Sequence, residues 1–269
     1  MQATAESKPR THAAQRGLLP LAAHRAGSAL MFAVFGVGAV VLALGLIFAR
    51  LVVRGAAPDR VAQRWIQRAF RAFAALGERL GIWSLEVTGR ERLARGPALV
   101  VANHPTLLDV VFLVSHLPQA DCVVKAAAWR NPFLLGIVRL AGYVPNRDGP
   151  DLVERCAARL RAGRTLVLFP EGSRSTAFGM RPFKRGAARI ALASGCAVRP
   201  VQIRCEPRIL GKDQAWWALP SETVRYTLRV GDDVDFGEWA AGLPGALAAR
   251  RLTEQLQRIF EAGVAADVA

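Results

Sequence analysis

Cysteine and histidine are scarce in this sequence, which contains four of each among 269 residues. No two cysteines form a Cys-x-x-Cys pair, and their flanking residues are typical of core positions in strands and a helix. We therefore expect neither a disulfide framework nor a zinc site, and a reducing compartment fits this cysteine usage. The histidines do not cluster along the chain, so no bound metal is expected. These residues are Cys122, Cys156, Cys196, Cys205, His12, His24, His104 and His116.

Acidic residues and lysines are also few. The chain has 36 basic residues against 21 acidic ones, a formal net charge of +15, and only Lys8, Lys125, Lys184 and Lys212 among the basic residues are not arginine. This balance favours anionic partners such as nucleic acid, lipid headgroups or phosphorylated substrates. An arginine- and alanine-rich genome is the alternative explanation. Because no nucleic-acid-binding motif is recognisable, we do not expect a nucleic-acid partner.

A nucleophile turn of the Gly-x-Ser-x-Gly type is absent as well. This absence disfavours a hydrolase that would use Ser173 or Ser175 as its nucleophile. No internal repeat or low-complexity segment occurs either, so a repeat architecture is not expected.

One long uncharged apolar run occupies residues 29–49. At 1.5 Å per residue a helix of this length spans about 30 Å, the hydrocarbon thickness of one bilayer. Basic residues flank both ends, so the positive-inside rule does not decide an orientation. A simple span fits the run, and so does a bend at Gly36, Gly38 or Gly45 that keeps both flanks on one anionic surface.

These patterns divide the chain into three segments. Residues 1–28 are polar and basic, which predicts a disordered tail. Residues 29–81 are expected to form the membrane-embedded helix and then an amphipathic helix at the membrane interface, the alternative being a helix packed on a soluble core. From residue 82 to 269, β-rich and helical runs alternate, which predicts an α/β domain with a mostly parallel central sheet flanked by helices. Strands are expected at 84–89, 98–103, 122–125, 165–170, 198–203 and 224–230, and helices at 105–116, 132–141, 150–162, 184–194 and 243–262.

Polar residues that suit acid–base chemistry follow the strand at 98–103. His104 lies at its carboxyl end, where open α/β sheets bind ligands, and Pro105 is expected to open a helix. One helical turn would then bring the Asp109 carboxylate back toward the imidazole. Such a carboxylate fixes the tautomer of the histidine and leaves its second ring nitrogen free to accept a proton.

A second polar segment, residues 171–175, follows the strand at 165–170. Gly172 permits close approach of the backbone to a ligand, and free N–H groups beside the Arg174 guanidinium suit a phosphate. A capped turn with a solvated arginine is the alternative.

Together these segments resemble the glycerolipid acyltransferases, which acylate lysophosphatidic acid and related acceptors. Four blocks match in order over roughly residues 84–230. They are NHPTLLD (103–109), similar to Asn-His-x4-Asp; GYVPNR (142–147); FPEGSRS (169–175), with Ser173 in place of the usual threonine; and VRPV (198–201). Lys125 and the stretch FKRGAARIA (183–191) are similar to further features of the family.

The resemblance implies a role for each matching residue. His104 would deprotonate the acceptor hydroxyl, which attacks an acyl thioester directly, and Asp109 would orient His104. The acceptor's glycerol and phosphate would be held by Glu171, Gly172, Ser173 and Arg174, with added positive charge from Lys125 and Arg147. Lys184 and Arg185 are further candidates that could equally be solvated or contact a headgroup. The expected co-substrate is acyl-acyl-carrier protein or acyl-CoA, with no cofactor.

The expected function is therefore a membrane-bound acyltransferase that converts 1-acyl-glycerol-3-phosphate to phosphatidic acid. The second block usually carries Asp before its Arg, whereas this chain has Asn146. This difference bears on which acceptor the enzyme uses more than on the reaction. Another lysolipid, an aminolipid or a specialised acyl chain is the alternative, and so is a non-catalytic lipid-binding membrane protein. The expected partners are a phospholipid surface, a lysophospholipid and the acyl carrier. We expect the inner (cytoplasmic) membrane, with the catalytic domain on the cytoplasmic face.

Overall fold

The computed structural model describes residues 18–52, 58–146, 150–215, 220 and 222–266. In this part of the chain, seven strands form one sheet in the order β1-β7-β6-β2-β5-β3-β4. All neighbouring strands are parallel except β6 and β7. The predicted α/β class with a mostly parallel sheet is therefore confirmed. The strands are β1 Trp83–Thr88, β2 Leu99–Ala102, β3 Asp121–Lys125, β4 Val144–Asn146, β5 Leu166–Leu168, β6 Val198–Glu206 and β7 Val224–Val230.

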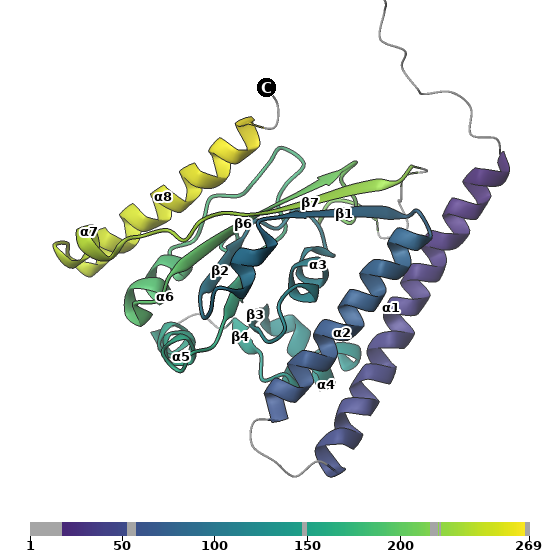
Figure 1. Cartoon of the computed structure of the whole chain (residues 1–269), viewed down its shortest axis with the longest axis horizontal. Helices are drawn as coiled ribbons and strands as arrows, with labels where there is room; N and C mark the ends of the chain where they lie inside the picture. The colour runs from purple at the N-terminus through teal and green to yellow at the C-terminus, as the bar shows by residue number, and fades with distance from the viewer. Residues whose placement is uncertain (1–17, 53–57, 147–149, 216–219, 221, 267–269) are drawn as a thin grey trace, which may run out of the picture.

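Helices cover both faces of the sheet (Figure 1). The strand β2 shows why its sequence does not alternate: Val100 and Ala102 join one apolar core while Leu99 and Val101 join the other, and all four are fully buried. Helices α1 to α4 contribute to the first core, and α5, α6 and α8 to the second. The helices are α1 Leu18–Val52, α2 Pro58–Arg79, α3 Asp109–Ser115, α4 Pro132–Leu140, α5 Pro150–Arg161, α6 Gly186–Ser194, α7 Gly237–Ala241 and α8 Gly245–Ala266, with short 3-10 turns η1 at Arg90–Ala94 and η2 at Ala126–Trp129.

The first helix is longer than the sequence predicted. It begins at Leu18, so the prediction of a disordered tail is wrong for residues 18–28, while residues 1–17 lie outside the described residues. Leucine and alanine dominate its first turns, and Pro20 lies where a helical N–H has no partner to lose. The helix continues through the three glycines, and its segment Arg25–Phe48 is long and apolar enough to cross a membrane.

The apolar side of α2 packs on the α/β domain and on α1. Ile66 is fully buried, and the Phe73 ring lies 5.4 Å from both Phe35 of α1 and Trp83 of β1. The Gln63 amide donates to the Asp121 carboxylate at 2.9 Å, which attaches the helix to the sheet. The alternative interpretation, a helix packed on the core, therefore describes this side of α2, and lipid contact of its exposed side stays a prediction.

Candidate active site

The predicted site residues meet at one edge of the sheet. His104 follows β2, Phe169 follows β5, and Lys125 ends β3. These three strands are parallel neighbours, so their carboxyl ends share one edge. A cleft of about 550 Å³ opens there, lined by His104, Leu107, Lys125, Gly172, Ser173, Arg174, Lys184, Arg185 and Arg189 among others.

His104 and Asp109 form a hydrogen-bonded pair. The His104 Nδ1 atom lies 2.8 Å from Asp109 Oδ2. The Asp109 carboxylate is fully buried, whereas the imidazole keeps 20% of its surface exposed and lines the cleft. Because Nδ1 is engaged by the carboxylate, Nε2 is the ring nitrogen free to accept a proton. The predicted pairing is what the structure shows.

The segment between the two residues is a turn, so the prediction that Pro105 opens the helix is wrong. Helix α3 begins only at Asp109. The Asp109 carboxylate accepts hydrogen bonds from the Thr106 N–H at 2.7 Å and the Thr106 hydroxyl at 2.6 Å. The Tyr226 hydroxyl lies 3.1 Å from Thr106 Oγ1 and holds it from the far side. Thr106 is thus a positioning residue that the sequence analysis missed, although it is polar and lies inside the His-x4-Asp block.

Burial raises the pKa of Asp109, while hydrogen bonds from His104 and Thr106 oppose that rise. A carboxylate with raised proton affinity is a strong acceptor for the imidazole N–H. The Phe169 ring stacks on the imidazole with 4.3 Å between centroids and fixes the plane of His104. Together these contacts hold the imidazole in one orientation at the wall of the cleft.

Glu171 lies beneath the cleft and binds protein groups. Its Oε1 accepts the His104 N–H at 2.8 Å and the Ser175 hydroxyl at 2.9 Å, and its Oε2 accepts the Arg181 N–H at 2.8 Å. The residue is buried and does not line the cleft. These contacts assign Glu171 to positioning the backbone of His104, and direct contact with an acceptor has no support in this geometry.

Gly172, Ser173 and Lys125 line the cleft side by side with Lys184. Gly172 has φ +69°, which strains any other residue, and an added Cβ would approach Lys184 Nζ to 3.1 Å, so the lysine end would have to shift slightly. The Lys125 ammonium donates to Ser173 Oγ at 3.2 Å. Burial, and then the positive charges of Lys212 and other nearby cations, lower the pKa of Lys125. Cations are therefore crowded together here, as in a site that binds an anion.

Arg174 also lines this part of the cleft, although one of its groups is already engaged. Its Nη1 donates to the carbonyls of Leu210 and Gly211 at 2.6 and 3.0 Å, which fixes the loop after β6. Its phosphate contact stays a prediction, and Arg147 lies outside the described residues. Arg199 in the fourth block is buried and forms a bidentate pair with Asp233, so this block supports the sheet.

A strand-end histidine paired with a carboxylate beside clustered cations suits general-base chemistry on an anionic substrate. The acyltransferase family model matches residues 84–204. Residues 84–204 are therefore similar to the acyltransferase family.

Individual relatives narrow the comparison. A chloroplastic 1-acyl-sn-glycerol-3-phosphate acyltransferase of Arabidopsis thaliana is 29% identical over 48% of this chain and 38% of its own length. The Helicobacter pylori enzyme of the same name is 30% identical over 43% of this chain and 48% of its own. A lyso-ornithine lipid O-acyltransferase of Pseudomonas aeruginosa is 33% identical over 40% and 43% respectively. This chain thus spans less than half the length of each of these three relatives.

The crystal structure of the 1-acyl-sn-glycerophosphate acyltransferase PlsC from Thermotoga maritima has the same fold. It matches with a TM-score of 0.73 and 20% identity, covering 93% of this chain and 98% of that one. The likeness extends beyond the family match of residues 84–204, so it includes the N-terminal helices.

Proposed function

We propose that this protein is a membrane-bound 1-acyl-sn-glycerol-3-phosphate acyltransferase. His104 Nε2 takes the proton of the acceptor's free hydroxyl, and the hydroxyl oxygen attacks the carbonyl carbon of an acyl thioester. The C–S bond breaks as the new ester forms, and the departing thiolate takes the proton from the imidazolium. The products are phosphatidic acid and a free thiol. The thioester donor is acyl-CoA or acyl-acyl-carrier protein.

The observation that carries this proposal is the placement of the His104–Asp109 pair beside a group of cations in one cleft. The cations near the base, Lys125 and Lys184, suit a phosphate that lies a few bonds from the reacting hydroxyl. The family of residues 84–204 and the names of the relatives support the same reaction.

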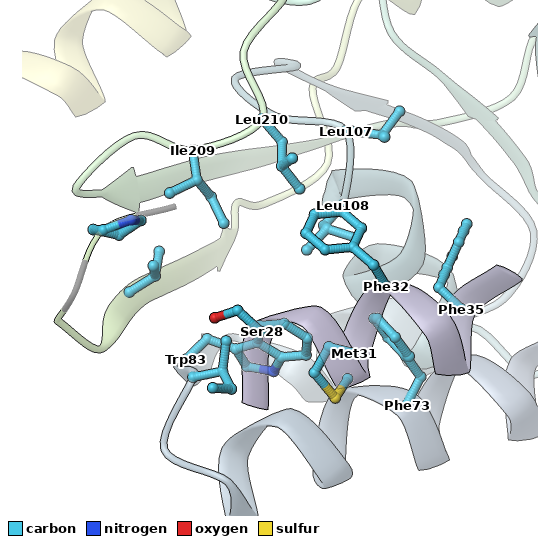
Figure 2. Close-up of a pocket in the computed structure, with 13 residues that line it drawn as sticks. Ser28, Met31, Phe32, Phe35, Phe73, Trp83, Leu107, Leu108, Ile209 and Leu210 are labelled. Atoms are coloured by element: carbon cyan, nitrogen blue, oxygen red, sulfur yellow. The ribbon is translucent and has the colours of Figure 1, made fainter. Parts of the chain in front are cut away.

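An apolar pocket next to the cleft supports a lipid substrate. It lies where α1 and α2 meet the α/β domain, and Figure 2 shows Met31 and Phe32 of α1 opposite Leu108 and Leu210. Leu107 lines both this pocket and the cleft of His104. An apolar space adjoining the base suits a fatty acyl chain.

The packing of α1 favours attachment to one leaflet. Ser28, Met31 and Leu46, spread over about 27 Å of helix at 1.5 Å per residue, are buried, and α2 and α4 pack on α1. A simple span would carry these two helices and their arginines into the bilayer with α1, which disfavours crossing. Its other side exposes apolar residues such as Val41 and Phe48, which would face lipid. We place the domain on the cytoplasmic face of the inner membrane.

A second candidate acceptor is a lysolipid with an amine-bearing headgroup. Asn146 lines the cleft where the family block usually has Asp, and the Pseudomonas aeruginosa relative is a lyso-ornithine lipid O-acyltransferase. Both observations concern the acceptor and leave the reaction unchanged.

The test is to incubate the purified protein with labelled acyl donors and a panel of lysolipids, with mass spectrometry of the products. We expect transfer to lysophosphatidate, abolished in His104→Ala and retained in the control Arg258→Ala on the exposed side of α8. Transfer only to lyso-ornithine lipid would select the second candidate. Lipid binding without turnover in the wild type, or full activity in folded His104→Ala, would reject the mechanism.

A further inference from the structure

Residues of α5 and α6 form part of the wall of the His104 cleft. Leu152 and Val153 of α5 line it on one side, and Ile190 of α6 lines it on the other. Arg185 and Arg189, at the start of α6 and one turn later, line the same space. The cleft therefore has apolar walls here and two arginines in addition to Lys125 and Lys184.

The two arginines have no ion-pair partner among the described residues. Other arginines of the domain do: Arg164 and Arg199 are paired with aspartates. Glu254 lies close enough to Arg185 for its charge to be felt, but its carboxylate is paired with Arg250. The first turn of α6 has no acidic residue. Exposed cations that line a cavity without a carboxylate are available to an anionic ligand.

Two substrates with different shapes must share this cleft. In the lysophosphatidate acceptor, the phosphate is only a few bonds from the reacting hydroxyl, so it belongs with Lys125 and Ser173 near His104. In the thioester donor, the whole pantetheine arm separates the reacting carbonyl from the first phosphate. A cleft lined by more cations than one phosphate requires fits this pair of anionic substrates.

We infer that Arg185 and Arg189 bind the phosphate of the donor's phosphopantetheine arm, and that the arm lies between α5 and α6. This inference rests on the proposed function and names the donor half of the same cleft. Coenzyme A and acyl carrier protein share this phosphorylated arm, so both donors would use the two arginines. Arg189→Ala alone removes one of two contacts, whereas the double variant removes the site.

The test compares Arg185→Ala/Arg189→Ala with Arg225→Ala/Arg258→Ala, which removes two exposed charges that do not line the cleft. With acyl-CoA, we expect the first variant to raise the donor KM about 10- to 100-fold, as for the loss of charged hydrogen bonds, and to leave the acceptor KM within about 2-fold. The control variant should match the wild type in both constants.

Shortened donors identify the group that is bound. The defect should persist with acyl-4′-phosphopantetheine and with acyl carrier protein, and it should disappear with acyl-pantetheine, which has no phosphate. A defect seen only with acyl-CoA would assign the arginines to its nucleotide, and a defect that remains with acyl-pantetheine would show a structural role. Either result overturns the inference, as does an unchanged donor KM.

Two further measurements separate the remaining explanations. If the double variant lost affinity for phosphatidylglycerol vesicles while the donor KM stayed unchanged, the arginines would face lipid and the inference would fail. Calorimetry of a non-transferable thioether analogue of acyl-CoA binding to His104→Ala measures donor affinity without turnover. Adding Arg185→Ala/Arg189→Ala to that variant should weaken this binding, and unchanged affinity would overturn the inference. Absence of any acyl transfer by the wild type would instead reject the proposed function.

Discussion

Replacing Asp109 with asparagine removes one charge from the catalytic pair and keeps the shape of the side chain. Asp109 Oδ2 accepts from His104 Nδ1–H and the Thr106 N–H, and Oδ1 accepts from the Thr106 hydroxyl. An amide nitrogen in place of Oδ2 would face two donors and force the wrong histidine tautomer. In place of Oδ1 it would face the Thr106 hydroxyl oxygen, which already accepts the Leu108 N–H and lies 3.1 Å from the Tyr226 hydroxyl.

Each orientation leaves a buried polar group without a partner, which costs about 1–3 kcal/mol of folding free energy. The loss of the negative charge also removes the group that stabilises the imidazolium. The same substitution in the Ser-His-Asp triad of serine proteases lowers kcat by about 10⁴. We therefore expect kcat to fall by about 10³ to 10⁴, or about 4 to 5.5 kcal/mol of transition-state stabilisation, with the acceptor KM little changed.

The released thiol of coenzyme A gives a continuous colorimetric assay at neutral pH. Burial raises the pKa of Cys122 and Cys205 to about 12 and that of Cys156 to about 11, so these thiols should stay protonated and contribute little background. A thermal melt confirms that the variant is folded. If folded Asp109→Asn kept more than about a tenth of the wild-type kcat, the carboxylate would not control the base as its contacts indicate.

Two further substitutions test the cleft and the membrane face. Because burial and neighbouring cations lower the pKa of Lys125 below its usual 10.5, the ammonium should lose its proton, and the acceptor KM should rise, at a lower pH than for a free lysine. Lys125→Arg stays charged and should give a flat profile over that range; identical profiles would contradict the phosphate role. Val41→Glu/Phe48→Glu should release the protein from vesicles, at about 2.5–3.5 kcal/mol per charge in hydrocarbon, while Leu247→Glu on α8 should not. Equal vesicle binding by both variants would show that α1 does not face lipid.

The centre of the sheet was the most predictable part because its strands β2 and β5 are buried on both faces. Continuous apolar runs marked β2 and β5 to within two residues of their observed ends. The edge strand Val144–Asn146 was missed: it pairs only with β3, has three residues and contains Pro145, so it lacks a periodic signal. The short helix Gly237–Ala241 was missed for the same lack of a pattern.

The position of the amphipathic helix α2 was only half predictable. Its spacing correctly marked an apolar side, but periodicity does not tell whether that side meets lipid or protein. Trp65 remains 45% exposed while Ile66 is fully buried, so the boundary between the two sides depends on how α2 packs against β1 and α3. Only tertiary structure holds this information.

At the site, residue chemistry identified His104 and Asp109 but not the contacts that hold them. Glu171 was predicted to touch the substrate, because a carboxylate at a strand end suggests chemistry. Its partners are the Ser175 hydroxyl and the backbone N–H groups of His104 and Arg181. Such pairings leave no mark on side-chain patterns, so sequence alone could not predict them.

The contacts of Glu171 bear on how chimeric enzymes of this type should be built. The Ser175 N–H also donates to the His104 carbonyl at 2.7 Å, so the loop at 171–175 and the base are joined by two hydrogen bonds, and the Ser175–Glu171 bond braces the loop itself. A loop transplanted from a relative to alter acceptor preference would therefore also shift the backbone of His104. Recombination should therefore exchange residues 103–109 and 169–182 as a single inherited unit.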